Sequence, residues 1–351
     1  MPDHILGHYD YHPVPKGEGS LQRGPTDFPS EPGQSAPRLL LPSAGRKVAL
    51  MHELERCFKV YPCGYAPPET ASCCLAGRTR FVEQPRNLTD VAYVTWMTEV
   101  CKRIGIDVIL PVRDGDMYRL DHMRELFDAL KVKLVLSPTK TIAVANDKLH
   151  MYETLRGKLN VPVTFRYPDW EQLNVWPCFV KDRFGAGSVV ARKVWTPEEL
   201  GRIAIRHNNV VIQPWVGSNE YTIDAFFGWG GELHQAVVRK RVTTTEGQMD
   251  HGVVVLPHEA LSRELLKLAN ALTFVGPINA QFIENHLSPG EFWLTDLNIR
   301  FGGGTPLSIH AGADFVRYLY QLVREEEITI GKVRLGTKAV SYLQYVYKEA
   351  W

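Results

Sequence analysis

The sequence has no marked excess of one charge and no long apolar run, and each absence excludes a class of protein. It carries 40 Lys and Arg residues against 39 Asp and Glu residues, so the formal net charge is +1. Such a balance gives no electrostatic footprint for nucleic acid or for an anionic membrane surface. No apolar run approaches the roughly 20 residues that cross a bilayer. We therefore expect neither a nucleic-acid partner nor a membrane partner.

Cysteine spacing that would indicate a metal site is also missing. The six cysteines form no CxxC pair, and no histidine couplet accompanies them at zinc spacing. The start of the chain has no charged segment followed by an apolar one, as a secretory signal peptide would have. We therefore expect reduced thiols and a cytoplasmic protein.

What is present is an ordinary globular composition after an unusual first segment. The 351 residues are 44% hydrophobic and 23% charged, enough for two or three subdomains with a buried core. Residues 1–37 are rich in Pro, Gly, Ser and His without apolar periodicity, so they cannot bury enough surface to offset their ordering entropy. We expect a disordered extension there, and its role as a docking or regulatory tail stays open.

From Arg38 the pattern alternates between strands and helices. An apolar strand, a small-residue turn at residues 43–45 and a helix from Val48 are followed by predicted strands at 58–61, 108–112 and 134–136, with helices at 91–104 and 119–130. This order predicts an α/β fold with an open parallel sheet. The first turn is not GxGxxG, so a dinucleotide site is poorly supported. Asp114 and Asp116 follow a strand, either as ligands at the edge of the sheet or as ordinary loop acids.

A glycine-rich hairpin follows a helix that Asn146 or Asp147 would cap. Two apolar runs at 178–181 and 188–194 flank a loop that holds Gly185, Gly187 and Ser188. Lys181 at its base could hold a phosphate as a point charge, with the loop as a flexible cover. A plain glycine hairpin beside a solvated lysine is the alternative.

The next segment has the parts that a purine nucleotide needs. Residues 210–213 predict a buried strand, Pro214 breaks it, and Glu220 begins another strand. Backbone groups near the proline could meet the base edge, Trp215 and Val216 its apolar faces, and Glu220 the ribose hydroxyls. The alternative is a linker between two subdomains.

The stretch at 292–313 combines two polar ligand types with a glycine cluster. Phe292, Leu294, Asp296, Asn298 and Arg300 share one parity and should project from one face of a strand. The oxygen atoms of the aspartate and asparagine suit Mg2+, and the arginine fork suits a phosphate or carboxylate. The glycines at 302–304 would let the backbone approach an anion. A strand that ends in a glycine turn with solvated polar residues is the alternative.

The remaining elements complete an antiparallel region. We predict a strand over 231–247 with Arg239 and Arg241 on one parity, a helix at 262–273, and a strand at 276–285 that pairs with the 292 strand through a turn near 288–290. A helix at 314–324 and a terminal strand near 339–347 follow.

The order of these motifs resembles the ATP-grasp superfamily. The motifs are SAGRKVAL, LPVRDGD, NDKLHMYETL, PCFVKDRFGAGS, VIQPWVGSNEYTID, NAQF and DLNIRFGGG. The similarity covers about residues 39–346 and is greatest to the branch of the carbamoyl-phosphate synthetase large subunit and the amino-acid ligases of pyrrolysine-type pathways. It implies a Rossmann-like pre-ATP-grasp domain at 38–140 and a two-lobed α+β ATP-grasp domain at 141–351, with a small lobe at about 160–217 and a large lobe at about 218–351.

The resemblance also assigns roles to individual residues. It implies that Lys148 and Lys181 hold ATP phosphates beneath the loop at 185–188, and that Glu220 takes the ribose. The adenine would meet Gln213, Trp215 and Val216. Asp296 and Asn298 would bind Mg2+ with Gln281 as a further candidate, while Arg300, Arg239 and Arg241 would stabilise the reacting groups. The implied cofactors are ATP and Mg2+, two ions for which Mn2+ could substitute.

The implied activity is an ATP-dependent carboxylate-amine ligase that forms ADP and phosphate from amino-acid-like substrates. Specificity would lie with Arg241, His251, Gly303, Thr305 and His310, and a homodimer is compatible with the sequence. The family usually has glutamate where Asp296 stands and often proline where Ile299 stands. Two alternatives stay open: a bicarbonate-activating synthetase of the carbamoyl-phosphate type, and a nucleotide-binding protein that has lost catalysis.

Overall fold

The computed structural model describes residues 9–10, 36–45, 47–65, 80–167, 169–173, 175–185, 190–207, 209–245 and 248–341. Within the first 37 residues it contains a short strand, β1 (Tyr9–Asp10), which pairs in parallel with β16 (Val333–Arg334). The prediction of a disordered extension over 1–37 is therefore wrong at these two residues. Most of that segment lies outside the described residues.

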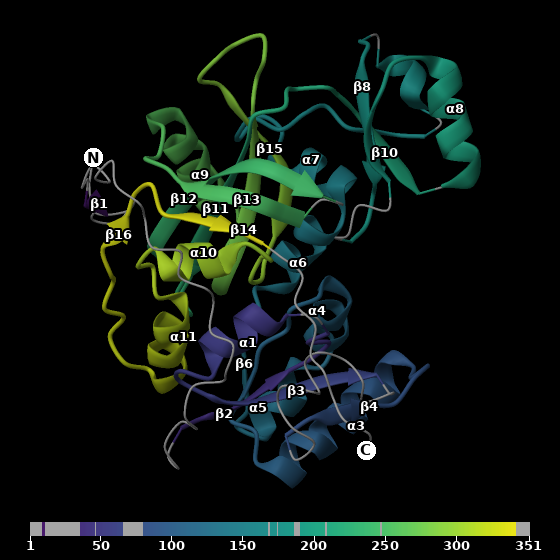
Figure 1. The fold of residues 1–351 in the computed structure, drawn as a ribbon. Coiled ribbons are helices and arrows are strands. Elements are labelled where there is room, and N and C mark those ends of the chain that lie inside the picture. The colour runs from purple at the N-terminus through teal and green to yellow at the C-terminus, as the bar shows by residue number, and fades with distance from the viewer. Residues whose placement is uncertain are drawn as a thin grey trace, which may run out of the picture.

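The first domain is an open parallel sheet, as predicted (Figure 1). Its order is β4-β3-β2-β5-β6. The strands are β2 (Arg38–Leu41), β3 (Lys59–Tyr65), β4 (Val82–Gln84), β5 (Val108–Ile109) and β6 (Lys133–Leu134), and the helices are α1 (Val48–Leu54), α3 (Asp90–Ile104), α4 (Asp114–Asp121) and α5 (Arg124–Ala129). The strand order reverses between β2 and β5, and sheets of this kind bind their ligands at such a point.

The helix predicted at 119–130 is wrong in extent. Two helices, α4 and α5, take its place, and they are separated at Met123, whose φ of −136° is not helical. Asp114 and Asp116 therefore occupy the first turn of α4 and not a loop. Negative charge is favourable there because the helix N-terminus carries partial positive charge.

Two short helices connect this domain to the rest of the chain. They are α6 (Thr139–Asn146), which the sequence analysis did not predict, and α7 (Lys148–Leu155). Asp147 caps α7, since its carboxylate accepts hydrogen bonds from the backbone N–H groups of Leu149 and His150. The predicted cap at this position is therefore confirmed for Asp147.

A small lobe projects from the body at the upper right of Figure 1. Its antiparallel sheet has the order β7-β10-β8-β9. The elements are β7 (Phe165–Arg166), the 3-10 helix η1 (Asp169–Gln172), β8 (Cys178–Asp182), β9 (Ala191–Val194), α8 (Pro197–Arg206) and β10 (Val210–Pro214). The lobe has a hydrophobic core of its own, built around Val180, Leu200 and Ile212. It is thus a separate packing unit.

The large lobe is a six-stranded sheet of order β15-β14-β11-β12-β13-β17. Its strands are β11 (Glu220–Phe227), β12 (Leu233–Thr245), β13 (Gln248–Val254), β14 (Gly276–Glu284), β15 (Phe292–Asn298) and β17 (Lys338–Val340), and its helices are α9 (Glu259–Ala271), α10 (Thr305–His310) and α11 (Phe315–Arg324). The predicted pairing of the 276 strand with the 292 strand is confirmed. Of the predicted strand near 339–347, the part from 342 on lies outside the described residues.

The first domain and the large lobe share their core. One hydrophobic cluster joins Leu40 and Ile109 of the parallel sheet to Phe282 of the large lobe, and a second joins Leu39 to Phe226. The parallel sheet and the large lobe are therefore packed together. The core of the small lobe contains residues of neither the parallel sheet nor the large lobe.

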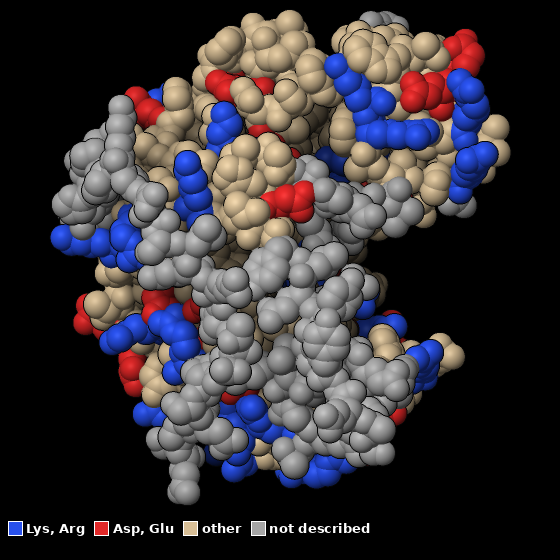
Figure 2. Space-filling view, in the orientation of Figure 1, with Lys and Arg blue, Asp and Glu red and all other residues tan. Residues whose placement is uncertain are grey.

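The described surface carries charges of both signs. Figure 2 shows Lys and Arg side chains interspersed with Asp and Glu over the face in view, outside the grey atoms. Among the described residues no helix is both long enough and apolar enough to cross a membrane. The four described cysteines, Cys57, Cys63, Cys101 and Cys178, are free thiols.

Candidate functional site

One face of the large sheet is lined with polar side chains, because the strands pair in a register that aligns them. Asp224 on β11 lies opposite Asn279 on β14, which lies opposite Asn298 on β15. The next row joins Thr222 and Gln281 to Asp296, with Arg239 of β12 opposite Thr222. Directly opposed residues of antiparallel strands project from the same face. The polar residues therefore form one surface, and the apolar residues of these strands pack into the core behind it.

A β-bulge at Thr295 makes this possible and corrects the predicted parity. Gln281 pairs with Asp296, but the adjacent Phe282 pairs with Leu294, so Thr295 is an extra residue. An extra residue reverses the direction of the side chains that follow it. Phe292 and Leu294 thus share the core cluster with Leu297 and Ile299, and Asp296, Asn298 and Arg300 face the other way. The prediction that all five even-numbered residues share one face is wrong.

The bulge also gives Lys181 of the small lobe a partner. Its Nζ donates a 2.5 Å hydrogen bond to the backbone carbonyl of Thr295. Lys148, at the start of α7, donates to the carbonyl of Gly185 at 2.9 Å and lies 3.8 Å from the carboxylate of Asp296. The structure therefore brings Lys148, Lys181 and Asp296 together where the small lobe meets the polar face.

The surroundings of Lys181 lower the pKa of its ammonium. Burial, together with the charge of Lys148, lowers this pKa from 10.5 to about 8, against the opposing negative charges of Asp296 and Glu220. All four residues thus lie near one another. The ammonium group of Lys181 is buried near two carboxylates and a second ammonium. An anionic ligand would therefore stabilise its charged form.

This pKa predicts how the affinity for ATP depends on pH. As pH rises from 7 to 9, Lys181 passes through its folded-state pKa of about 8 and loses its charge, so the dissociation constant of ATP should increase. Bound phosphate stabilises the ammonium form, so binding near pH 8 should take up protons from the buffer. Calorimetric titration with ATP across this range, in buffers of different ionisation enthalpy, measures both effects. Equal affinity at pH 7 and 9 without proton uptake would contradict a contact between Lys181 and phosphate.

Asp224 is the centre of a buried network that the sequence analysis did not identify. Its carboxylate is fully buried and accepts hydrogen bonds from Arg239 at 2.7 and 3.1 Å and from Asn279 at 2.7 Å. The hydroxyls of Thr305 and Ser308 on α10 donate to the same carboxylate, at 3.1 and 2.6 Å. The network therefore ties three strands to α10.

This network holds one of the predicted arginines and two of the predicted glycines. Arg239 is 2% exposed, and its guanidinium donates two hydrogen bonds to the carboxylate of Asp224. The glycines at 302 and 304 have a packing reason: a Cβ on Gly302 would lie 2.6 Å from Asn279, and one on Gly304 would lie 2.5 Å from Arg239. The N–H of Gly302 is taken by the hydroxyl of Thr305. Gly302 and Gly304 thus lie against the network, whereas a Cβ on Gly303 would meet nothing within 4 Å.

Arg241, the other arginine on this face of β12, forms an ion pair with Glu220. The pair lies on the polar face, with the two side chains 7% and 24% exposed. Glu220 therefore lies on the polar face, as the predicted ribose site requires, but it is already paired with Arg241.

Arg300 joins the polar face to the first domain. Its guanidinium donates to Asp114 at 3.1 Å and to Asn298 at 2.8 Å. Lys47 lies near this pair: burial, together with the charges of Arg300 and Arg113, lowers its pKa to about 8, and the charge of Asp114 opposes them. Three cations thus surround one carboxylate where the point of reversal of the parallel sheet meets the large lobe.

Asp116 lies further inside the same edge of the sheet. It is 6% exposed, its Oδ1 accepts from the hydroxyl of Tyr93 at 3.1 Å, and burial raises its pKa. The two interpretations that the sequence left open therefore apply to different residues. Asp114 contacts Arg300 of the candidate site, whereas Asp116 is buried and contacts Tyr93.

The segment between the two lobes uses part of its backbone internally. The N–H of Trp215 donates to the carbonyl of Pro177, and the carbonyl of Val216 accepts from the backbone N–H of His286 at 2.9 Å and from its ring. The side chain of Gln213 is buried and donates to Thr164. An adenine edge would therefore have to meet the other backbone groups of this segment.

The side chains that are predicted to bind Mg2+ are those of Asp296, Asn298 and Gln281. Asp296 is the one carboxylate among the three predicted ligands, and Asn298 lies beside it, with its amide nitrogen 3.2 Å from the aspartate. No cluster of three or more His, Cys, Asp and Glu side chains exists among the described residues. Mg2+ accepts one or two carboxylates and takes its other ligands from phosphate and water. The residues thus fit an ion that a nucleotide brings with it.

Other predicted residues lie farther out or are not described. Gly187 and Ser188 lie outside the described residues, and Gly185 adopts a left-handed conformation with φ of 76°. Thr305 is buried in the Asp224 network, whereas His310 is exposed. His251 is half-buried on β13.

Two of three comparisons with known proteins found matches. The profile of a family described as "ATP-grasp in the biosynthetic pathway with Ter operon" matches residues 206–344. No protein with a curated description shows significant sequence similarity to the chain.

Solved structures resemble the fold over most of its length. An L-amino acid ligase from Bacillus licheniformis is 15% identical with a TM-score of 0.64, covering 82% of this chain and 74% of its own. An N5-carboxyaminoimidazole synthetase from Staphylococcus aureus in complex with ADP is 15% identical with a TM-score of 0.66, covering 85% and 80%. The biotin carboxylase domain of a 2-oxoglutarate carboxylase from Hydrogenobacter thermophilus, in complex with MgADP and bicarbonate, is 14% identical with a TM-score of 0.66, covering 86% and 73%.

Proposed function

We propose that this chain is an ATP-grasp protein, and that it is an ATP-dependent ligase that activates a substrate carboxylate as an acyl phosphate for capture by an amine. The observation that carries the proposal is the meeting of Lys148, Lys181 and Asp296 between two separately packed lobes. Two cations beside a carboxylate suit a triphosphate with its metal ion. The ADP that is bound in a similar structure supports the same choice of ligand.

In this proposal each residue has a defined role. Lys148 and Lys181 hold the phosphates, and Glu220 binds the ribose while it also contacts Arg241. Asp296 and Asn298, with Gln281 opposite Asp296, would hold Mg2+ or Mn2+. The ion would neutralise negative charge on the phosphates. The rest of the catalysis is alignment, because phosphoryl transfer needs little covalent participation by the protein.

The substrate carboxylate would lie near Arg300. A carboxylate oxygen attacks the γ phosphorus, the bond to ADP breaks, and the amine then attacks the acyl carbon and releases phosphate. Arg300 is held by Asp114 and Asn298, so its fork is oriented before substrate binds. Lys47 and Arg113 add positive charge at the same place, which favours a substrate with a carboxylate group such as an amino acid.

A screen of ADP release tests this proposal. The full chain is incubated with ATP, Mg2+ and each amino acid, singly and in pairs, and ADP and phosphate are measured. We expect ADP release that requires a particular amino acid or pair. Bicarbonate-dependent release without an amino acid would favour a carboxylase-type reaction, as in the biotin carboxylase relative. ATP binding without turnover over the whole panel would show that the protein has lost catalysis.

A further inference from the structure

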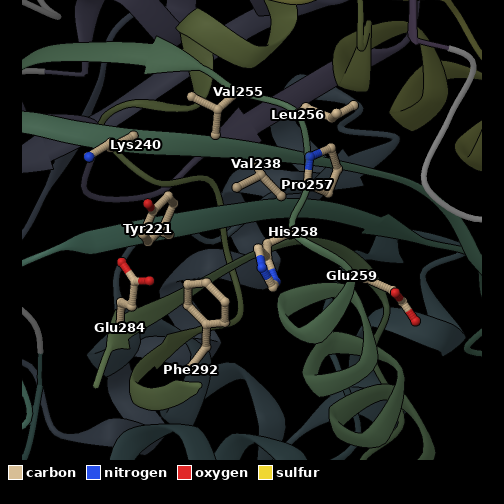
Figure 3. A pocket seen from close by; sticks show the side chains of 10 residues that line it. All are labelled: Tyr221, Val238, Lys240, Val255, Leu256, Pro257, His258, Glu259, Glu284 and Phe292. Atoms are coloured by element: carbon tan, nitrogen blue, oxygen red, sulfur yellow. The ribbon is translucent and has the colours of Figure 1, made fainter. Parts of the chain in front are cut away.

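A cavity lies on the face of the large sheet opposite the polar face (Figure 3). Its volume is about 420 Å³, within the range of roughly 300–1,000 Å³ that is usual for small-molecule sites. Tyr221 and Lys240 are paired residues of β11 and β12, and Glu284 and Phe292 are paired residues of β14 and β15. The cavity thus has a floor of four strands, and the segment that leads into α9 covers it.

One end of this cavity carries opposite charges that no contact joins. Lys240 and Glu284 lie on either side of Tyr221, and no ion pair links them (Figure 3). The ammonium of Lys240 is 5.7 Å from the centre of the Tyr221 ring and pairs with no carboxylate of the described chain. The carboxylate of Glu284 is fixed by the N–H of Gly290 at 3.0 Å and by the amide of Asn219 at 3.2 Å. A carboxylate has about four acceptor positions, so capacity remains for a ligand.

The other end is apolar and aromatic. Phe292 meets Tyr221 edge-on, with ring centres 5.4 Å apart, and His258 lies 5.3 Å from Phe292. His258 is held in place because its Nδ1 accepts from the N–H of Ala260 as the cap of α9. The remaining apolar lining comes from Val238, Val255, Leu256 and Pro257. A flat or branched hydrocarbon group would find contacts on several sides there.

We propose that this cavity binds a free α-amino acid with an apolar side chain. Its carboxylate meets Lys240, its ammonium meets Glu284, and its side chain lies against Phe292 and His258. A ligand with a single charge would leave one of the two protein charges desolvated without a partner, which is costly, whereas a zwitterion satisfies both. The apolar end then selects leucine-like or phenylalanine-like side chains over polar ones.

This site is separate from the proposed reaction. Glu220 and Arg241, the sequence neighbours of Tyr221 and Lys240, point to the opposite face of the same strands. The inference therefore does not depend on the ligase proposal, and an occupant would lie one sheet thickness from the cleft.

Isothermal titration of the full chain tests the proposal with leucine, isoleucine, valine, methionine, phenylalanine and tryptophan. Because an amino acid could also bind in the cleft, the titrations are repeated with Arg300→Met. At least one of these amino acids should bind at one site per chain in both proteins. Lys240→Met and Glu284→Gln should each raise its dissociation constant about tenfold or more, since each removes a hydrogen bond to a charged group.

The ligand itself supplies a second test. The amide of the same amino acid and its deaminated acid should each have a dissociation constant that is higher by about tenfold or more. Lys240→Arg should keep binding, and Lys102→Met, at an exposed position of α3, should leave it unchanged. The proposal is overturned if no member of the panel binds, if binding is insensitive to Lys240→Met and Glu284→Gln, or if Arg300→Met removes it.

Discussion

Asp296→Ala is expected to lower the rate of ADP release by about 10²–10³-fold, the scale of losing one preorganised electrostatic contact to a reacting group. Asp296 is the single carboxylate among the predicted metal ligands, and it is 3.8 Å from Lys148. Its charge also raises the pKa of Lys181, so the substitution should reduce the charge of that lysine at pH 7. The rate is measured under saturating substrate found by the screen of amino acids.

The fold should survive this change. The side chain of Asp296 is 24% exposed and belongs to no hydrophobic cluster, so the melting temperature should change little. Glu326→Ala is the matched control, because Glu326 forms an exposed pair with Arg324 far from the polar face. An unchanged rate for Asp296→Ala would exclude the metal role, and equal losses in both variants would point to a general effect on the protein.

Asp224→Ala should have the largest effect on stability. Asp224 and Arg239 are 0% and 2% exposed, and removal of one partner of a buried pair leaves the other charge uncompensated. The cost is typically ~3–5 kcal/mol in the free energy of unfolding. Three further hydrogen bonds, from Asn279, Thr305 and Ser308, are lost at the same time. Denaturant unfolding at pH 7 measures the difference.

The exposed pair of Arg324 and Glu326 again provides the comparison. Glu326→Ala should cost less than about 1 kcal/mol, because surface ion pairs contribute little. Asp224→Asn, which keeps two polar atoms in place, should fall between the two variants and remain measurable if Asp224→Ala does not fold. A loss below about 1 kcal/mol for both Asp224 variants would contradict a structural role for the network.

The order of elements was largely predictable because apolar periodicity decides it. The helix at 90–104 and the strands at 108, 133, 220 and 276 begin within a few residues of where the pattern places them. The break at Met123 was not predictable, since the sequence around it contains neither proline nor glycine. The short helix α6 was missed because it has no capping signal: its N-cap residue, Pro138, makes no side-chain hydrogen bond.

The site was predictable in its residue types and less so in its geometry. Lys148, Lys181 and Asp296 come from three segments that only the folded chain brings together, and the resemblance supplied that grouping. The bulge at Thr295 has no signal in the sequence, yet it decides which side of β15 faces the cleft. Asp224 was overlooked because one carboxylate in an apolar strand does not reveal its five donors.

Gly302 and Gly304 show that one sequence pattern can have more than one cause. A glycine cluster after a strand predicts close approach of the backbone to another group. For these two glycines, the side chains of Asn279 and Arg239 are such groups. Arg239 and Arg241 share a parity and look equivalent in the sequence, but one is buried against Asp224 and the other pairs with Glu220 at the cleft.

The central claim is that the substrate carboxylate is activated as an acyl phosphate. The product in which one carboxylate oxygen is found tests this claim most directly. The substrate acid identified by the screen is labelled with oxygen-18 in its carboxylate and incubated with the full chain, ATP, Mg2+ and the amine. Activation as an acyl phosphate transfers one labelled oxygen to inorganic phosphate, with ADP as the other product. Label found in AMP, or phosphate that carries none, would contradict it.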